Sequence, residues 1–384
     1  MHGITGRSTA DGSVICVSIE NGLISSVSAP DPDEDARDLP YLSYGMFDSQ
    51  VNGYGGRGYT LADFDESQLR DIISNLAKAG VAQHIPTIVT GPHANFLKNL
   101  AILSSAAEGD DDISAAIPKV HLEGPYISSE DGPRGAHSAR HVRNPDLHEF
   151  EDWQHAAGGK IAMITLAPEL PGALSFIEEI VHSGVIVSIG HTAATPAVIR
   201  QAIEAGAGFS THLGNGSHAM IPRHENYIWE QLASDQLGMG IISDGHHLPS
   251  AMVRALVRAK GLSRTVLVSD VSRMAGLDPG EYHWGDTHVR IHQDGHLTVV
   301  GTPFLAGAGH LLDWAVAHFI SFTGCELSEA LSLCTHNPAR LFETGSGVLE
   351  RGAPANITTF DYKNEDERLG IRGVWRLGKQ VYSM

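Results

Sequence analysis

The sequence has few cysteines, no long apolar segment and no recognisable signal peptide. Three cysteines occur among the 384 residues, Cys16, Cys325 and Cys334, and none belongs to a CxxC pair. We therefore expect reduced thiols and no disulfide framework. The first residues, MHGITGRSTADGS, lack an apolar core, and no run of about 18 apolar residues follows. These absences predict a cytoplasmic protein without a membrane partner.

Basic residues are also scarce. Lys and Arg number 26 against 45 Asp and Glu, which gives a net charge of −19. This charge repels phosphate backbones and anionic membranes at long range, so we expect no nucleic-acid partner. A local basic pocket for one small anion is still compatible with it. Histidine, by contrast, is abundant, with 22 residues in the chain.

Both chain ends carry β-strand patterns. The amino end reads VICVSIE-NG-LISSVSA, and Asn21-Gly22 suits a type I′ turn between two strands. The carboxyl end reads NITTFDY and VWRL-GK-QVYS, with a tight turn expected at Gly378-Lys379. We predict that residues 1–44 and 349–384 form one small β-domain, a β-sandwich, into which the rest of the chain is inserted.

Apolar runs that suit buried strands recur between the two ends, and helical patterns separate most of them. One pattern places apolar residues of Leu69–Leu76 at i, i+3, i+4 and i+7, with Asp65 and Gln68 spaced as a capping box. Another begins at Thr195-Pro196, an N-cap followed by a first-turn proline. The eight strand candidates are GMFDSQV, VAQHIPTIV, AIPKVHLEG, IAMITLAPE, GVIVSIGH, GFSTHLGN, GMGIISDG and TVLVSD.

This alternation predicts a (β/α)8 barrel of the TIM type over residues 45–348. A doubly wound sheet is the alternative, but no strand leads into a G-x-G-x-x-G turn. Residues 282–299 interrupt the pattern with HVRIHQ-DG-HLTVV, which predicts a hairpin turning at Asp294-Gly295 and inserted after the eighth strand. Helical segments near 306–320 and 327–335 then complete the barrel.

Polar residues stand where the predicted strands end, which is where barrels assemble their active sites. A single histidine or carboxylate there is more often structural than catalytic, but the set as a whole has the composition of a metal centre. One carboxylate and two imidazoles from three strands supply the protein ligands of a catalytic zinc-type site, and a further aspartate could take a proton from a bound water. Nitrogen and oxygen donors suit Zn²⁺, Fe²⁺, Co²⁺ or Mn²⁺. The strand-end residues are Gln50, Asn52, His121, Glu123, His191, His212, Asp244, His246, His247 and Asp270.

The motifs around these residues occur in a recognisable order. They read FDSQVNG, HLEGPYIS, GAH, SIGHTAAT, THLGNG, ISDGHH, LVSD…AG, GTPFLAG and THNPARLF. In this order they resemble the N-acetylglucosamine-6-phosphate deacetylases of the amidohydrolase superfamily, from about residue 45 to the end of the chain. The resemblance implies a metal-dependent amide hydrolase that removes the acetyl group of an amino sugar, and a homodimer.

The resemblance also assigns roles. Glu123, His191 and His212 match the metal ligands, and Asp270 matches the general base that activates the metal-bound water and then returns the proton to the leaving amine. His137 matches a histidine that polarises the amide carbonyl. Most of the superfamily has His-x-His at the end of the first strand, but some members of this family have Gln-x-Asn there and use one divalent ion. Gln50 and Asn52 therefore imply a single ion, with zinc as the first candidate and Fe, Co or Mn as alternatives.

Substrate recognition departs from the family pattern. Asn215, Gly216 and His247 match substrate-binding positions, whereas His246 is an additional histidine. The family's R-E-P-G segment supplies an arginine from the neighbouring subunit to the sugar phosphate. Here Arg223 stands nearest, followed by His-Glu-Asn.

Two substrate classes stay open on this basis, a 6-phosphorylated N-acetyl amino sugar and an unphosphorylated N-acyl amino sugar or other small amide. Tyr227 and Trp229 could stack on a sugar, and we expect Trp229 in the core because its neighbours are apolar. A non-catalytic barrel is disfavoured because Glu123, His191, His212 and Asp270 are all present. Deamination usually requires the His-x-His pair that this chain lacks.

Overall fold

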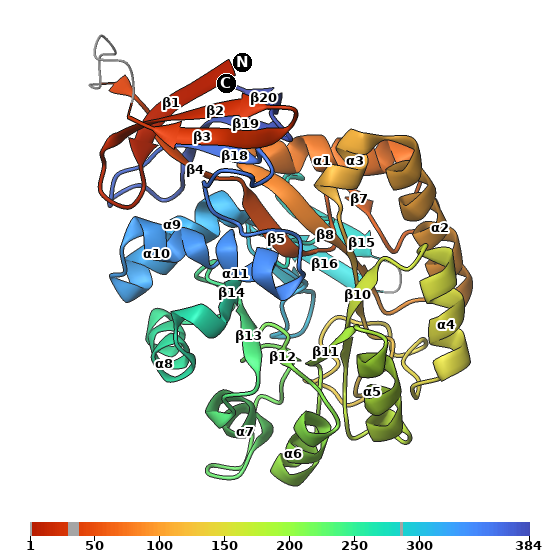
Figure 1. Ribbon diagram of the computed structural model, residues 1–384. Coiled ribbons are helices and arrows are strands. Elements are labelled where there is room, and N and C mark those ends of the chain that lie inside the picture. Colours follow the sequence, from red (N-terminus) through yellow and green to blue (C-terminus); the bar gives the residue numbers. More distant parts are fainter. Residues whose placement is uncertain (1, 30–37, 285–286) are drawn as a thin grey trace.

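The computed structural model describes residues 2–29, 38–284 and 287–384. Its main unit is a barrel of eight parallel strands that pair in chain order and that the helices surround (Figure 1). A bridge between Val51 and Val271 joins the first strand to the chain that follows the last, so the barrel closes. The eight predicted strands and the barrel are confirmed. The strands are β5 (Met46–Val51), β8 (Val81–Val89), β9 (Val120–Glu123), β10 (Ile161–Leu166), β11 (Ile186–Ile189), β12 (Phe209–Ser210), β13 (Gly238–Ile241) and β14 (Thr265–Leu267).

The outer helices bury the apolar faces that the sequence periodicity predicts. In α1, Leu69, Ile72 and Leu76 are buried, and the Asp65 carboxylate accepts a hydrogen bond from the Gln68 N–H as an N-cap. The Gln68 side chain donates to the carbonyl of Asp63 instead of completing the capping box. The helices are α1 (Glu66–Lys78), α2 (His93–Gly109), α3 (Asp111–Ala116), α4 (Leu147–Ala156), α5 (Ala173–His182), α6 (Pro196–Glu204), α7 (Tyr227–Ala233) and α8 (Ser250–Lys260).

The insertion after the eighth strand is larger than the predicted hairpin. Strands β16 (Thr287–Ile291) and β17 (Leu297–Val299) form that hairpin, and β15 (Gly280–Trp284) adds a third antiparallel strand. The chain from Val300 to Leu311 is then non-helical, and helix begins only at Leu312. Three helices complete the barrel, α9 (Leu312–Thr323), α10 (Leu327–Ser332) and α11 (His336–Leu341). Two strands of two residues each follow β5 in the chain and pair with each other, β6 (Gly53–Tyr54) and β7 (Arg57–Gly58).

The second unit is a small β-domain that both chain ends build, as predicted. Its core contains Val17, Ile24 and Ile357. Asn21 and Gly22 have φ values of 51° and 78°, as a type I′ turn requires. The carboxyl-terminal turn lies at Leu377 and Gly378, one residue earlier than predicted. The sheet order is β20 (Lys379–Ser383), β19 (Gly370–Arg376), β18 (Ile357–Asp361), β4 (Tyr41–Tyr44), β1 (His2–Ser8), β2 (Val14–Glu20) and β3 (Leu23–Ser28).

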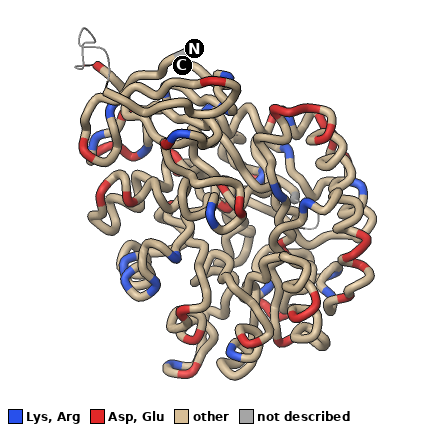
Figure 2. The backbone as a smooth tube through the Cα atoms, viewed as in Figure 1, with Lys and Arg blue, Asp and Glu red and all other residues tan. Residues whose placement is uncertain are grey.

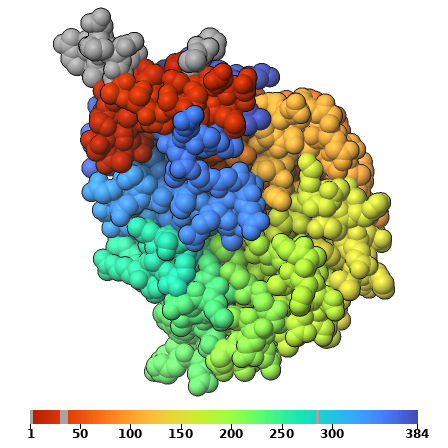
Figure 3. Space-filling model, viewed as in Figure 1, coloured from red at the N-terminus to blue at the C-terminus, as the bar shows by residue number. Residues whose placement is uncertain are grey.

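The β-domain lies against one side of the barrel, as the space-filling view shows (Figure 3). Arg376 of β19 is buried at this junction, where its Nε donates to the carbonyl of Ala82 at 2.7 Å and its Nη1 lies 3.0 Å from Asp112. Asp and Glu lie on the outer helices and on the β-domain, interspersed with Lys and Arg (Figure 2). None of the helices in the described ranges has the length and hydropathy needed to cross a bilayer.

Candidate metal centre and active site

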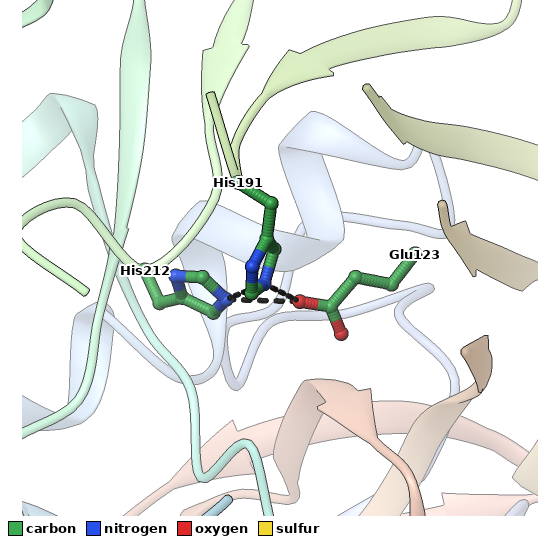
Figure 4. Close-up of side chains that lie close together, drawn as sticks. All are labelled: Glu123, His191 and His212. Atoms are coloured by element: carbon green, nitrogen blue, oxygen red, sulfur yellow. Dashed lines mark hydrogen bonds and ion pairs between the residues drawn. The ribbon is translucent and has the colours of Figure 1, made fainter. Parts of the chain in front are cut away.

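Three predicted ligands converge at the carboxyl ends of three barrel strands. Glu123 ends β9, His191 follows β11 and His212 follows β12, and their side chains point toward one another (Figure 4). The Nε2 atoms of both histidines lie 2.9 Å from Oε1 of Glu123 and 3.1 Å from each other. All three residues are buried.

Nε2 of His191, Nε2 of His212 and Oε1 of Glu123 form a triangle. This arrangement suits a bound divalent cation better than it suits hydrogen bonds among the three groups. His191 donates from Nδ1 to the carbonyl of Pro133 at 2.8 Å, which leaves a lone pair on Nε2 when the ring is neutral. A proton shared along one edge of the triangle leaves lone pairs facing each other along another edge. A cation among the three atoms would satisfy all of them at once, and one carboxylate with two imidazoles is a donor set that zinc and related ions accept.

The backbone at these positions is strained. Six non-glycine residues in the described ranges have positive φ, and three of them are His191 (51°), His212 (28°) and Asp270 (51°). L-residues rarely adopt this region, and strain of this kind concentrates at functional sites. Here the left-handed turn comes directly after a buried strand, and it turns each side chain into the mouth of the barrel.

Gln50 and Asn52, at the end of the first strand, connect the Asp270 carboxylate to the triangle by hydrogen bonds. Nε2 of Gln50 donates both to Oε2 of Glu123 and to Oδ1 of Asp270, each at 3.1 Å. Nδ2 of Asn52 donates to the same Oδ1 at 2.8 Å. Two amides therefore hold one oxygen of Asp270, and no hydrogen bond to its other oxygen, Oδ2, is found among the described residues. The two amide side chains act as donors to carboxylates.

Burial and neighbouring charges separate the pKa values of the two carboxyl groups. Burial would raise the pKa of Glu123, but the hydrogen bonds and charges of His191 and His212 outweigh it and hold this pKa well below its usual range. Burial and, to a smaller extent, the negative charge of Glu123 raise the pKa of Asp270 to about 6. A cation at the triangle would lower the pKa of Asp270 from this value.

His137 lies beside the triangle, on the loop between β9 and α4. Its ring centre is 4.4 Å from that of His191, and its Nδ1 is 2.8 Å from Oγ1 of Thr90, which follows β8. Burial and the neighbouring His191 lower the pKa of His137 to about 3, so the ring is neutral at neutral pH. If the Thr90 hydroxyl donates to Nδ1, the proton of the ring is on Nε2, and His137 presents an N–H donor.

A cavity of about 470 Å³ opens over these groups, and most of the predicted substrate residues line it. Asn215 and Gly216 are on one wall, and Gly216 packs so closely on His191 that a Cβ there would lie 2.8 Å from Nδ1 of its ring. His247 is on another wall, where its Nδ1 lies 2.7 Å from Oδ2 of Asp244. The remaining oxygen of Asp244 accepts the backbone N–H groups of His246 and His247.

The segment after His212 carries two of the predicted residues at the surface, Arg223 and Trp229. Arg223 is exposed and does not line the cavity of its own chain. The expectation that Trp229 packs in the core is wrong, because Trp229 is 53% exposed on α7. The helix turns Tyr227 inward instead, and its hydroxyl accepts the backbone N–H of His218 at 2.9 Å.

Two residues that support the site were assigned no role in the sequence analysis. Thr90 follows the end of the second strand, and this position is a signal that could have identified it. Its partner, His137, lies 47 residues away in the sequence, so the contact becomes evident only in the folded structure. Asp244 was noted at a strand end without a role, and the structure pairs it with His247. Arg273 also lines the cavity, three residues after Asp270.

The fold and these side chains together define a (β/α)8 barrel with a candidate divalent-metal centre at the carboxyl ends of its strands. A family profile described as "Amidohydrolase family" matches residues 41–381. The chain therefore belongs to the amidohydrolase family.

The relatives of this chain include deacetylases of amino-sugar phosphates. The N-acetylglucosamine-6-phosphate deacetylase of Bos taurus is 33% identical over 89% of this chain and 84% of its own length. The N-acetylgalactosamine-6-phosphate deacetylase of Escherichia coli O157:H7 is 28% identical over 92% and 93%. Among solved structures, the N-acetyl-D-glucosamine-6-phosphate deacetylase of Mycobacterium smegmatis in complex with N-acetyl-D-glucosamine-6-phosphate superposes with a TM-score of 0.88, at 25% identity and full coverage of both chains.

Proposed function

We propose that this chain is a metal-dependent hydrolase that removes the N-acetyl group from an amino sugar, with N-acetylglucosamine-6-phosphate as the first candidate substrate. The observation that carries the proposal is the meeting of Glu123, His191 and His212 beside Asp270 at the floor of one cavity. The names of the relatives supply the bond and the sugar.

Asp270 is the proposed general base and acid. A divalent ion held by Glu123, His191 and His212 would lower the pKa of a water and polarise the acyl oxygen. Asp270 has one oxygen fixed by Gln50 and Asn52, and the other can accept the proton of the attacking water. The same carboxyl then gives this proton to the amine that leaves, so one carboxylate suffices for both steps.

His137 is the proposed donor to the acyl oxygen. Its neutral ring, held through Nδ1 by Thr90, can direct an Nε2–H at the charge that develops on this oxygen. Asn215, Gly216 and His247 are the proposed contacts to the sugar, and the Asp244 carboxylate orients His247 for this contact.

We propose one ion in this centre, with zinc as the first candidate and Fe, Co or Mn as alternatives. Gln50 and Asn52 occupy the strand end where a second ion would need ligands, and they donate N–H groups to Glu123 and Asp270. Gln50 directs N–H groups at both carboxylates, and an N–H group cannot act as a ligand for a second cation between them.

Recognition of the sugar phosphate and dimerisation are linked in this proposal. We propose a cytoplasmic homodimer in which Arg223 of one chain reaches the cavity of the other, as the family resemblance implies. An exposed Arg223 outside its own cavity supports this arrangement, as does Met220, which is 89% exposed on the same segment. The unpaired cysteines suit a reducing compartment. The same position of Arg223 also favours the alternative, an unphosphorylated N-acyl amino sugar or small amide, if the chain does not dimerise.

A substrate panel separates these possibilities. Release of acetate would be measured with N-acetylglucosamine, its 6-phosphate and N-acetylgalactosamine-6-phosphate, using wild-type protein and Arg223→Ala. The proposal predicts the highest kcat/KM for a 6-phosphate, and an increase in KM for that substrate alone in the variant. Equal turnover with and without phosphate would select the alternative, and no acetate from any substrate would refute the deacetylase.

A further inference from the structure

A second group of histidines lies outside the proposed catalytic centre, at the inserted hairpin. His246, on the loop after β13, faces the turn between β16 and β17, which carries Asp294 and His296. One candidate ligand atom from each of these three residues lies within 4.8 Å of the other two. Nδ1 of His296 is 2.6 Å from Oδ1 of Asp294, and the rings of His246 and His296 stack with centres 5.0 Å apart. We call these three residues the hairpin cluster.

Neighbouring rings hold the hairpin cluster in place. His292 stacks on His296 at 3.8 Å, and its Nε2 is 2.9 Å from Oγ1 of Thr298. His310 stacks on His246 at 5.6 Å and donates from Nε2 to the carbonyl of Asp294 at 3.0 Å. Packing and hydrogen bonds therefore fix the cluster from two sides, which reduces the ordering that a bound ligand would otherwise require.

The donor set of the cluster, two imidazoles and one carboxylate, suits a transition-metal ion. Unprotonated imidazole and carboxylate are the forms that bind metals, and two imidazoles favour zinc, cobalt, nickel or copper over magnesium and calcium.

We propose that His246, Asp294 and His296 bind a second divalent transition-metal ion, separate from the one at Glu123, His191 and His212. This ion ties the inserted three-stranded sheet to the loop after β13. That loop also carries His247, and Asp244 accepts the backbone N–H groups of both adjacent histidines, so the tie acts directly beside the catalytic cavity. The insertion also lines this cavity, through Thr287.

Metal content measured on four proteins tests the binding. Each is stripped with a chelator, reloaded with Zn²⁺ or Co²⁺, desalted and analysed by mass spectrometry of the metal. We expect two ions per chain in the wild type and one in His246→Gln/His296→Gln. We also expect one in His191→Gln/His212→Gln, which removes the other centre. The control His148→Gln changes an exposed histidine that has only Glu151 beside it, at 3.3 Å, and should keep two ions.

Two results would overturn the proposal. The first is that His246→Gln/His296→Gln binds as much metal as the wild type. The second is that His191→Gln/His212→Gln binds no metal at all. The variant Asp294→Asn, a surface change, provides the same comparison if the double variant misfolds. If His191→Gln/His212→Gln keeps two ions while His246→Gln/His296→Gln loses one, the result contradicts the proposed catalytic metal centre and leaves the hairpin cluster supported.

Hydrogen exchange tests the tie. Adding Zn²⁺ to the stripped wild type should slow amide exchange in residues 287–299 and 243–248 together, and in His246→Gln/His296→Gln it should leave both segments unchanged. Slowing in both proteins, or in neither, would contradict the tie.

Discussion

Asn52 offers the sharpest test of how the candidate base is controlled. Its Nδ2 donates to Oδ1 of Asp270 at 2.8 Å, and Asn52→Leu removes this hydrogen bond while nearly preserving the side-chain volume. A hydrogen bond to a charged group contributes about 1.5–3 kcal/mol. Because one pKa unit corresponds to about 1.4 kcal/mol, the pKa of Asp270 should rise by about 1–2 units. The second bond to this oxygen, from Gln50, stays in place.

The sign of the effect follows from the role proposed for Asp270. A general base acts only when ionised, so activity is lost as pH falls through its pKa, and a higher pKa moves this loss to higher pH. The pKa of about 6 applies without a bound cation, so the tested quantity is the difference between the two proteins. We expect the acid limb of log kcat/KM to move upward by about 1–2 pH units in Asn52→Leu, with recovery toward the wild-type rate at alkaline pH.

The assay is acetate release between pH 4.5 and 9.5, with metal content measured in the same samples. Asn95→Leu is the matched control, because Asn95 also lines the cavity but donates to the carbonyl of Thr60 and not to Asp270. A variant that is slower by the same factor at every pH, with its acid limb unmoved, would refute the reasoning.

Three further predictions concern other parts of the molecule. Asp270→Asn should reduce kcat by at least about 1,000-fold while metal content stays at the wild-type level, and appreciable residual turnover would exclude Asp270 as the base. Asp244→Asn weakens the 2.7 Å contact to His247 and should reduce kcat/KM by about 10- to 100-fold, unless His247 plays no part in binding substrate. Arg376→Met leaves the carbonyl of Ala82 without its buried partner and should lower unfolding stability by about 2–4 kcal/mol, so an unchanged midpoint in urea would contradict the importance of this contact.

The sequence predicted the fold well because strand and helix periods are local signals. The eight apolar runs became eight barrel strands, and Asn21-Gly22 formed the expected turn because only a few residue types accept positive φ at both positions. The third strand of the insertion, β15, was missed.

The site could be predicted in part for a related reason. In a parallel barrel, strand ends from distant segments meet on one face, so a cluster of polar strand-end residues was expected there, and the family resemblance singled out Glu123, His191 and His212 within it. The contacts that complete the site have no local signal. Nε2 of Gln50 reaches Asp270 across 220 residues, and the sequence does not indicate which oxygen it contacts.

Trp229 shows the opposite error. Apolar neighbours at Ile228 and Leu232 suggested burial, but helix α7 has only seven residues, and a short segment does not indicate which of its sides faces the barrel. Burial of Tyr227 and Leu232 left Trp229 on the outer side.

The central claim is that Glu123, His191 and His212 hold one divalent ion beside Asp270. A crystal structure with anomalous data collected at the zinc absorption edge tests it directly. The account predicts one anomalous peak about 2.0–2.2 Å from Nε2 of His191, Nε2 of His212 and an oxygen of Glu123, and none at Gln50 and Asn52. A peak bound by the two amides, or the absence of a peak at the three ligands in active protein, would contradict it.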